Sequence, residues 1–153
     1  MRMRLALIAM PCVLLSMFLQ GCGGAGDTPE DELRLWVANA QAAVEEEDRA
    51  TLMGMLAENY ADARGNDRSA IDQVFRFYFL RQDSVVLVSN IEEITISGET
   101  AAIVRLTAAM AGANDAALGF SADAYRFELE LENHGNEWLL VAARWRELGE
   151  KIR

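Results

Sequence analysis

The sequence is poor in the residue types that most often build metal, redox or nucleophilic sites. Its 153 residues include two cysteines, Cys12 and Cys22, and a single histidine, His134. Structural zinc sites usually combine several cysteine and histidine ligands, so no metal site is expected. The GxSxG, HExxH and CxxC patterns are also missing, which removes the usual signatures of a serine hydrolase, a zinc protease and a dithiol redox pair.

Basic residues are scarce as well. Fourteen Lys and Arg residues stand against 24 Asp and Glu residues, giving a net charge of −10. A surface of that sign repels phosphate backbones, so we expect no nucleic acid partner. No GxxxxGK[ST] phosphate loop occurs, and the glycines of Gly21–Gly26 belong to a flexible tether. We therefore expect no cofactor.

The only long uncharged apolar run lies at the start of the chain. Two arginines in Met1–Arg4 precede Leu5–Leu19, which holds 15 residues without a charge. A membrane-spanning helix needs about 20 apolar residues, so this run is better suited to the core of an export signal. The residues Leu19-Gln20-Gly21-Cys22 follow it directly.

This arrangement resembles bacterial lipoproteins, in which the signal is cut before a cysteine that then receives lipid. The resemblance implies residues 1–21 as signal peptide, lipidation at Cys22 and residues 22–28 as a tether. Cys12 leaves with the signal, and acylation accounts for the odd cysteine that remains. By the same resemblance, Gly23 after the lipidated residue favours the outer membrane, facing the periplasm. The alternatives are an uncleaved membrane anchor or a secreted protein with a chance cysteine.

Helices are predicted in the first half of the remaining chain. Thr28 is a candidate N-cap, with Pro29 at the first helical position and acidic residues behind it. Apolar residues then recur at helical spacing as far as Glu47: Leu33, Trp36, Val37, Ala40 and Val44. Asp48 can cap a second, shorter helix that carries Leu52, Met53 and Leu56.

A third helix is predicted after a loop over Tyr60–Asp67. Asn66 or Asp67 can cap it. Its apolar side chains occupy nearly the whole helix circumference, which predicts a buried helix. These residues are Ile71, Val74, Phe75, Phe77, Tyr78, Phe79 and Leu80.

The second half predicts four antiparallel strands. Alternation slips within Ser84–Ser97, so either both faces of that strand are covered or a β-bulge bends it. The next strand places Ala102, Val104, Leu106 and Met110 on one face, and Tyr125–Glu132 alternates most regularly. Trp138–Leu148 is apolar on both parities, so we expect another element or another subunit to cover its second face.

Three helices followed by a bent antiparallel meander resemble the nuclear transport factor 2-like superfamily, also described as SnoaL-like or cystatin-like. The resemblance covers residues 29–153 and is carried by element order and two local segments. These are Tyr60-Ala61-Asp62 with Arg64-Gly65-Asn66-Asp67, and Trp138-Leu139-Leu140-Val141 with Arg144-Trp145-Arg146. It implies one α+β domain in which three helices pack in a curved four-stranded sheet shaped as a cone.

The superfamily includes isomerases, cyclases and dehydratases as well as binding domains, so fold alone does not select a function. The candidate residues of a cone cavity are Tyr60, Asp62, Arg64, Asp67, Tyr78 and Arg105. In an enzyme, Asp62 would be a buried base, with Tyr60 or Tyr78 as hydrogen-bond donor. In the structural alternative, the aspartates brace the loop, the tyrosines fill core, and Arg105 faces solvent or pairs with an acid.

We favour a non-catalytic binding or assembly module over an enzyme, because the sequence offers no convergent acid–base set. The alternatives are a small cofactor-independent isomerase-like or dehydratase-like enzyme, a hydrophobic ligand carrier, and a passive structural lipoprotein. The expected partners are the membrane, through Cys22, and a second copy of the chain or an envelope protein. His134 is interpreted as a solvated turn residue.

Overall fold

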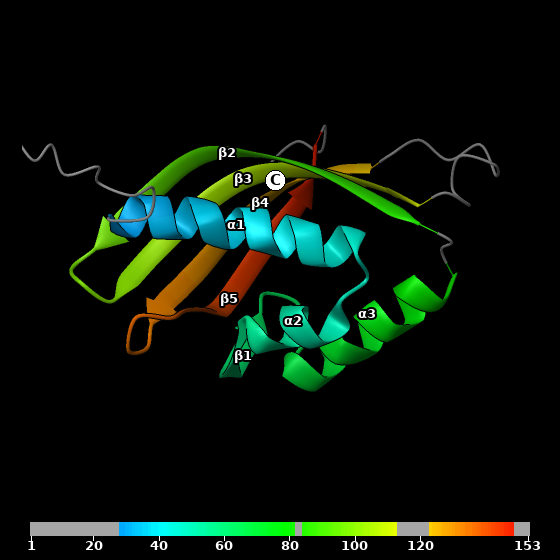
Figure 1. The fold of residues 1–153 in the computed structure, drawn as a ribbon, viewed down its shortest axis with the longest axis horizontal. Coiled ribbons are helices and arrows are strands. Elements are labelled where there is room, and N and C mark those ends of the chain that lie inside the picture. Colours follow the sequence, from blue (N-terminus) through cyan, green and yellow to red (C-terminus); the bar gives the residue numbers. More distant parts are fainter. Residues whose placement is uncertain (1–27, 82–83, 113–122, 149–153) are drawn as a thin grey trace, which may run out of the picture.

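The computed structural model describes residues 28–81, 84–112 and 123–148, so the predicted signal, Cys22 and the tether lie outside the described residues. Three helices come first, interrupted by one short strand, and four longer strands follow (Figure 1). The elements are α1 (Pro29–Glu45), α2 (Arg49–Gly54), β1 (Leu56–Asp62), α3 (Arg68–Arg81), β2 (Val85–Ser97), β3 (Ala101–Gly112), β4 (Asp123–Asn133) and β5 (Trp138–Glu147). The α+β class expected from the sequence is confirmed.

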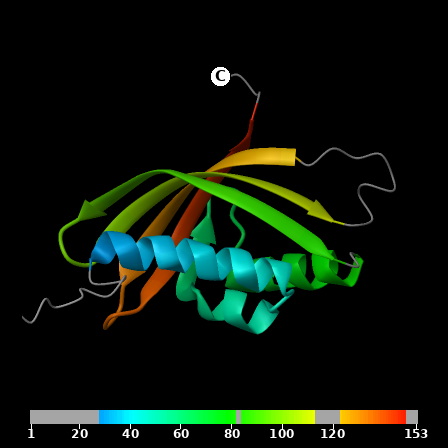
Figure 2. The ribbon, with the colours of Figure 1, turned by 45° about the horizontal axis from the view of Figure 1, so that its top comes forward.

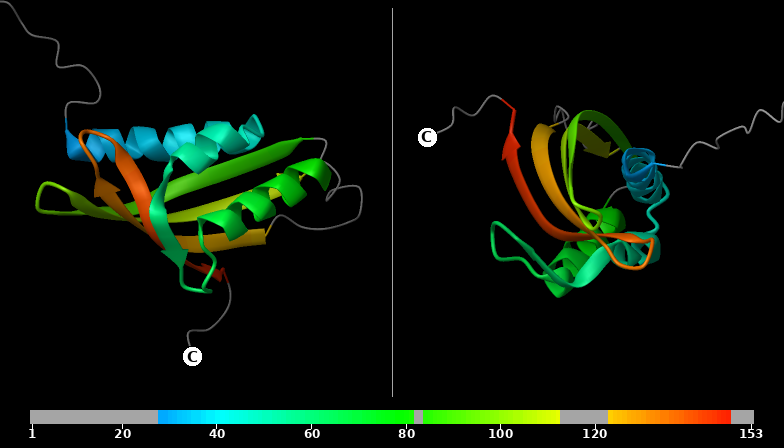
Figure 3. Two further views of the ribbon diagram at one scale, coloured as in Figure 1. Left: turned by 90° about the horizontal axis from the view of Figure 1, so that it is seen from below. Right: turned by 90° about the vertical axis from the view of Figure 1, so that its left-hand side faces the viewer.

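The strands form one sheet in the order β1-β5-β4-β3-β2. The pairs from β2 to β5 are antiparallel, whereas β1 runs parallel to β5. The sheet curves around the side on which the helices lie (Figure 3). The long strands β2 and β3 arch past α1 along its length. Helix α2 lies below α1, and α3 lies toward the C-terminal end of α1 (Figure 2). This curvature leaves a concave face for a pocket.

The first strand is a correction to the prediction. Leu56 was expected in the second helix and Tyr60–Asp62 in a loop, but they belong to β1, so the sheet has five strands and is mixed. The segment is poor in the β-branched residues that favour strands, and its burial does not alternate. It is a strand because it pairs with β5, a contact about 80 residues distant that no local pattern reveals.

Two bulges explain the irregular alternation of β2 and β5. In β2 the register slips between Ile91 and Glu93, so Glu92 is the extra residue. Val86 and Val88 therefore face outward, with 57% and 64% of their surface exposed, and the predicted bulge is confirmed. In β5 the register slips at Val141. Apolar residues on both parities of β5 thus follow from a bulge, which re-aims side chains within one strand.

The core lies between α1 and the concave face of the sheet. Its most buried side chains are Leu33 of α1, Val104 of β3 and Leu131 of β4, each no more than 1% exposed. Thr28 caps α1 as predicted, accepting a hydrogen bond from the Asp31 amide. At the other end of the sequence, the Trp138 indole donates to Glu32 Oε2 over 2.8 Å, which ties β5 to α1.

The third helix is less buried than its composition predicts. No residue of α3 is buried, and Val74, Phe77 and Leu80 are 55%, 62% and 80% exposed. The helix packs against β1 and α2 at the margin of the sheet and does not pass through its centre. The Arg81 guanidinium lies 5.1 Å from the Phe77 ring and covers part of that apolar surface. Prediction of a fully buried helix was therefore wrong.

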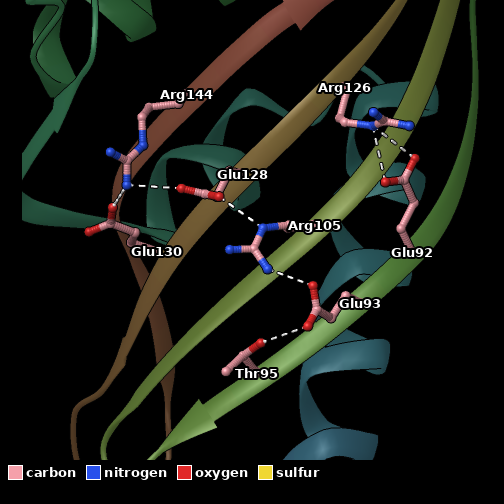
Figure 4. Close-up of polar contacts among 8 residues, drawn as sticks. All are labelled: Glu92, Glu93, Thr95, Arg105, Arg126, Glu128, Glu130 and Arg144. Atoms are coloured by element: carbon pink, nitrogen blue, oxygen red, sulfur yellow. Dashed lines mark hydrogen bonds and ion pairs between the residues drawn. The ribbon is translucent and has the colours of Figure 1, made fainter.

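The convex face of the sheet carries a ladder of ion pairs across four strands (Figure 4). Glu128 of β4 lies 2.9 Å from both Arg105 and Arg144, and Arg105 reaches Glu93 at 2.5 Å. The bulged Glu92 joins Arg126 at 3.0 Å. Arg105 thus pairs with acids of neighbouring strands, as the sequence suggested. Because these charges are partly exposed, each pair contributes modestly to stability.

The depth of Leu33 in this core gives a direct test of the fold. Replacing Leu33, which is 0% exposed, by alanine should lower the free energy of unfolding by about 2–5 kcal/mol, because a cavity remains. The matched Leu35→Ala change, on the same helix but 56% exposed, should cost less than about 0.5 kcal/mol. Urea unfolding of both variants measures this. Equal losses would contradict the placement of α1.

Candidate functional site

The concave face of the sheet and the helices enclose a pocket of about 640 Å³. That volume lies in the range of about 300–1,000 Å³ typical of small-molecule sites. Side chains from every helix and strand line it, and most are aliphatic or aromatic. Aromatic rings are prominent, namely Trp36, Tyr60, Phe75, Tyr78, Tyr125, Phe127 and Trp145. The interior is therefore an apolar cavity with a few polar groups.

Arg64 is the only charged side chain among the described lining residues. Its guanidinium carbon lies 4.7 Å from the centroid of the Trp145 ring, a cation–π distance. Trp145 in turn stacks on Phe127, with 6.2 Å between the ring centroids. A cation thus lies at the aromatic wall that β4 and β5 give the pocket.

The loop after β1 places Arg64 through the carboxylate of Asp62. Its Oδ1 accepts hydrogen bonds of 2.8 Å from the backbone amides of Arg64 and Asn66, and Oδ2 accepts one of 2.8 Å from the Asn66 side chain. Gly65 completes the turn at φ +83°, a conformation that glycine adopts without strain. The Ala63 amide donates to the Ala143 carbonyl at 3.0 Å, which fastens the turn to β5.

These contacts also set the charge state of Asp62. Burial raises the pKa of Asp62, but the hydrogen bonds from Asn66 and Arg64 and the nearby guanidinium outweigh burial, so the pKa falls below its ordinary value. A carboxylate held in this way is a weak base. It is also absent from the described lining of the pocket. The geometry therefore gives Asp62 the structural task of bracing the loop.

The tyrosines named from the sequence both line the pocket. Tyr60 is 5% exposed, and burial, followed by the negative charge of Asp62, raises the pKa of Tyr60 to about 12. Its hydroxyl consequently stays protonated at neutral pH and can donate a hydrogen bond. Tyr78 lines the pocket from α3 and packs edge-on against Phe79. Both side chains come within reach of a ligand in the cavity.

The other candidates lie away from the pocket. Asp67 caps α3 by accepting from the Ala70 amide at 2.8 Å, and Arg105 lies in the ion-pair ladder. His134 is exposed in the turn between β4 and β5, 3.3 Å from Glu132. Within the described ranges, no cluster of three or more His, Cys, Asp or Glu residues could hold a metal. No helix in the same ranges is long and apolar enough to cross a bilayer.

Two polar features of the site were not predicted. The Trp36 indole nitrogen is buried and has no hydrogen-bond partner, although Trp36 lines the pocket. Gln41 of α1 accepts a 2.8 Å hydrogen bond from Ser89 of β2, and both residues also line the pocket. The sequence showed Trp36 only as part of an apolar stripe. Whether an indole finds an acceptor depends on tertiary packing that no spacing encodes.

The role of Asp62 gives a pH test. Because its pKa is lowered on folding, the stability that it contributes is present above the ordinary value of 3.8 and is lost as pH falls through the folded-state pKa. We expect Asp62→Asn to be less stable than the parent at neutral pH, with a difference that shrinks below pH 4. Urea unfolding across a pH series measures it, with exposed Glu99→Gln as control. A difference independent of pH would contradict the assignment.

Comparison with known proteins identifies the fold through solved structures. No protein-family model matches the chain, and no curated protein sequence matches it. Solved structures do. A nuclear transport factor 2-like protein of unknown function from Shewanella oneidensis matches with a TM-score of 0.65 and 15% identity, over 77% of this chain and 98% of the other.

Two further structures are similar. A ketosteroid isomerase-like protein from Erwinia carotovora matches with a TM-score of 0.58 and 12% identity, over 76% of this chain and 94% of the other. Bd1075 from Bdellovibrio bacteriovorus matches with a TM-score of 0.65 and 9% identity, over 78% of this chain, which spans only 41% of Bd1075. At these identities the likeness concerns the fold alone. The domain has the nuclear transport factor 2-like, cystatin-like fold.

Proposed function

We propose that the chain is a non-catalytic, envelope-anchored lipoprotein that binds an apolar small molecule inside its cone. The observation that carries this proposal is the apolar pocket of about 640 Å³. A packed cone would have removed the cavity, but Phe77 points away from the core with 62% of its surface exposed, and α3 lies to one side. Burial of an apolar ligand against such a wall contributes about 25 cal/mol per Å² of apolar surface removed from water.

The lining supports binding more than catalysis. Proton transfer next to a carbonyl needs a base within hydrogen-bond reach of the substrate. The described lining residues include no Asp, Glu or His side chain. Tyr60, with a pKa of about 12, can donate a hydrogen bond but is a poor proton acceptor at neutral pH. An isomerase-like enzyme is the second candidate, favoured by the likeness to a ketosteroid isomerase-like structure.

Binding can be tested by filling the cavity. Ala40 lines the pocket, whereas Ala38 is exposed on the same helix. We expect Ala40→Phe to weaken the binding of decanol, a neutral apolar probe, at least tenfold, or about 1.4 kcal/mol. Ala38→Phe should bind decanol as the parent does.

The measurement uses the three indole N–H signals in NMR spectra of the full chain in a nonionic detergent. Trp36 and Trp145 line the pocket, whereas Trp138 does not and donates to Glu32. Decanol should therefore move the signals of Trp36 and Trp145 and leave that of Trp138 in place. Equal movement of all three, or none, would count against a ligand in the cone.

Anchoring is tested separately at Cys22, which lies outside the described residues. Cys22→Ser should abolish incorporation of radioactive palmitate and release the protein from the membrane fraction, because one thiol carries the lipid. Cys12→Ser, within the proposed signal, should leave labelling unchanged. Labelling that persists in Cys22→Ser would remove the proposed location but not the pocket.

A further inference from the structure

Among the described lining residues, the charged side chain and the buried indole nitrogen without a partner are hydrogen-bond donors, whereas the hydroxyls of the three tyrosines and Ser89 can donate or accept. Arg64 supplies a guanidinium, and an indole N–H has no acceptor capacity, so Trp36 can only donate. The side-chain oxygen of Gln41 already accepts from Ser89 at 2.8 Å. From this we propose that the ligand is an apolar monocarboxylate, with its carboxylate on Arg64 beside Trp145 and its apolar part along the remaining wall. This inference rests on the proposed binding function.

Arg64 is placed to hold an anion. The Asp62 carboxylate accepts from the backbone amide of Arg64, so the loop is fixed. The side chain lies over the Trp145 ring at 4.7 Å. Stacking occupies a face of the guanidinium and leaves its edge, where the N–H donors lie, for a carboxylate, which matches that fork with two parallel hydrogen bonds.

The unpartnered indole of Trp36 is a second, independent observation. A buried donor without an acceptor is unfavourable relative to a paired one. Because the nitrogen itself is buried, that cost is recovered only if the wall around Trp36 shifts on binding and lets a ligand oxygen reach the indole N–H. Tyr60, 5% exposed, adds a hydroxyl to the same cavity. An acceptor-bearing ligand suits this set, whereas a pure hydrocarbon would leave the Trp36 donor unpaired.

A cationic ligand fits the same pocket poorly. Rings can attract cations, but Arg64 already lies over the Trp145 ring. No acidic side chain occurs among the described lining residues to balance a second positive charge. Glu93 and Glu128, on two of the lining strands, face outward and pair with Arg105. The Asp62 carboxylate lies beside the lining, but it already accepts three hydrogen bonds and faces the Arg64 charge. Charge within the cavity therefore selects against an ammonium group.

Three probes of one chain length separate these cases: decanoate, decanol and decylammonium. Each is titrated into the full chain in nonionic detergent, and affinity is taken from the indole signals of Trp36 and Trp145. We expect decanoate to bind at least tenfold more tightly than decanol, and decylammonium more weakly than either. Added salt should lower the decanoate affinity, since part of the attraction is electrostatic.

Variants assign the preference to Arg64. In Arg64→Gln the ratio of decanoate to decanol affinity should fall about tenfold, and Arg64→Lys should keep only part of the preference, because the charge remains but the planar fork is lost. Arg144→Gln, which removes the same charge from the convex ladder, should leave the ratio unchanged. Partition of a probe into micelles cancels when variants are compared. An unchanged Trp138 signal shows that each variant is folded.

The outcomes separate this inference from the proposed function. A ratio unaltered in Arg64→Gln, or decanol or decylammonium binding as tightly as decanoate, would overturn the carboxylate assignment while leaving apolar binding intact. If none of the three probes moves the signals of Trp36 and Trp145, the proposed binding function fails, and the carboxylate assignment fails with it. A decanoate preference that is lost in Arg64→Gln and kept in Arg144→Gln supports both the proposed binding function and the carboxylate assignment.

Discussion

The parallel pairing of β1 with β5 determines where the chemistry of this domain lies. Asp62 is in register with Ala143, and the next amide, that of Ala63, donates to the Ala143 carbonyl at 3.0 Å. The turn that follows is thereby attached to the strand that carries Trp145. Parallel pairs need a long connection, and here α3 and the antiparallel meander supply it. Without this pair, Arg64 would lie on a free loop, far from any fixed aromatic partner.

A single carboxylate converts that attachment into a defined site. Asp62 satisfies two backbone amides and one side-chain amide, which fixes the turn more firmly than chain connectivity alone could. The same use lowers its pKa and makes it unsuitable as a base. In this fold a carboxylate beside the cavity can brace the wall or do acid–base chemistry. Its three hydrogen bonds here hold the turn that carries Arg64. This structural role is the physical reason for proposing a binding protein ahead of an enzyme.

Local patterns predicted the elements whose causes are local. Thr28, Asp48 and Asp67 cap helices because short polar side chains at those positions satisfy free amides. The bulge of β2 was visible as a slip in alternation, since an extra residue reverses parity. By contrast, β1 depends on a partner distant in sequence, and burial of α3 depends on where the sheet ends. The loop motif contained both Asp62 and Arg64, but their separate roles required the geometry of the turn.

The charged residues of the convex face and the one charged residue of the pocket lining have different surroundings. The chain has a net charge of −10, but acids on the convex face are paired with arginines in the ladder that includes Glu93, Arg105 and Glu128. Their fields are therefore partly neutralised where they arise, and salt screens the remainder beyond about 8 Å. Arg64 lies apart from this ladder, in an exposed loop, with its guanidinium over the Trp145 ring of the pocket wall. A domain that is acidic overall can thus present an arginine to its pocket, and the proposed choice of a carboxylate ligand depends on that one residue.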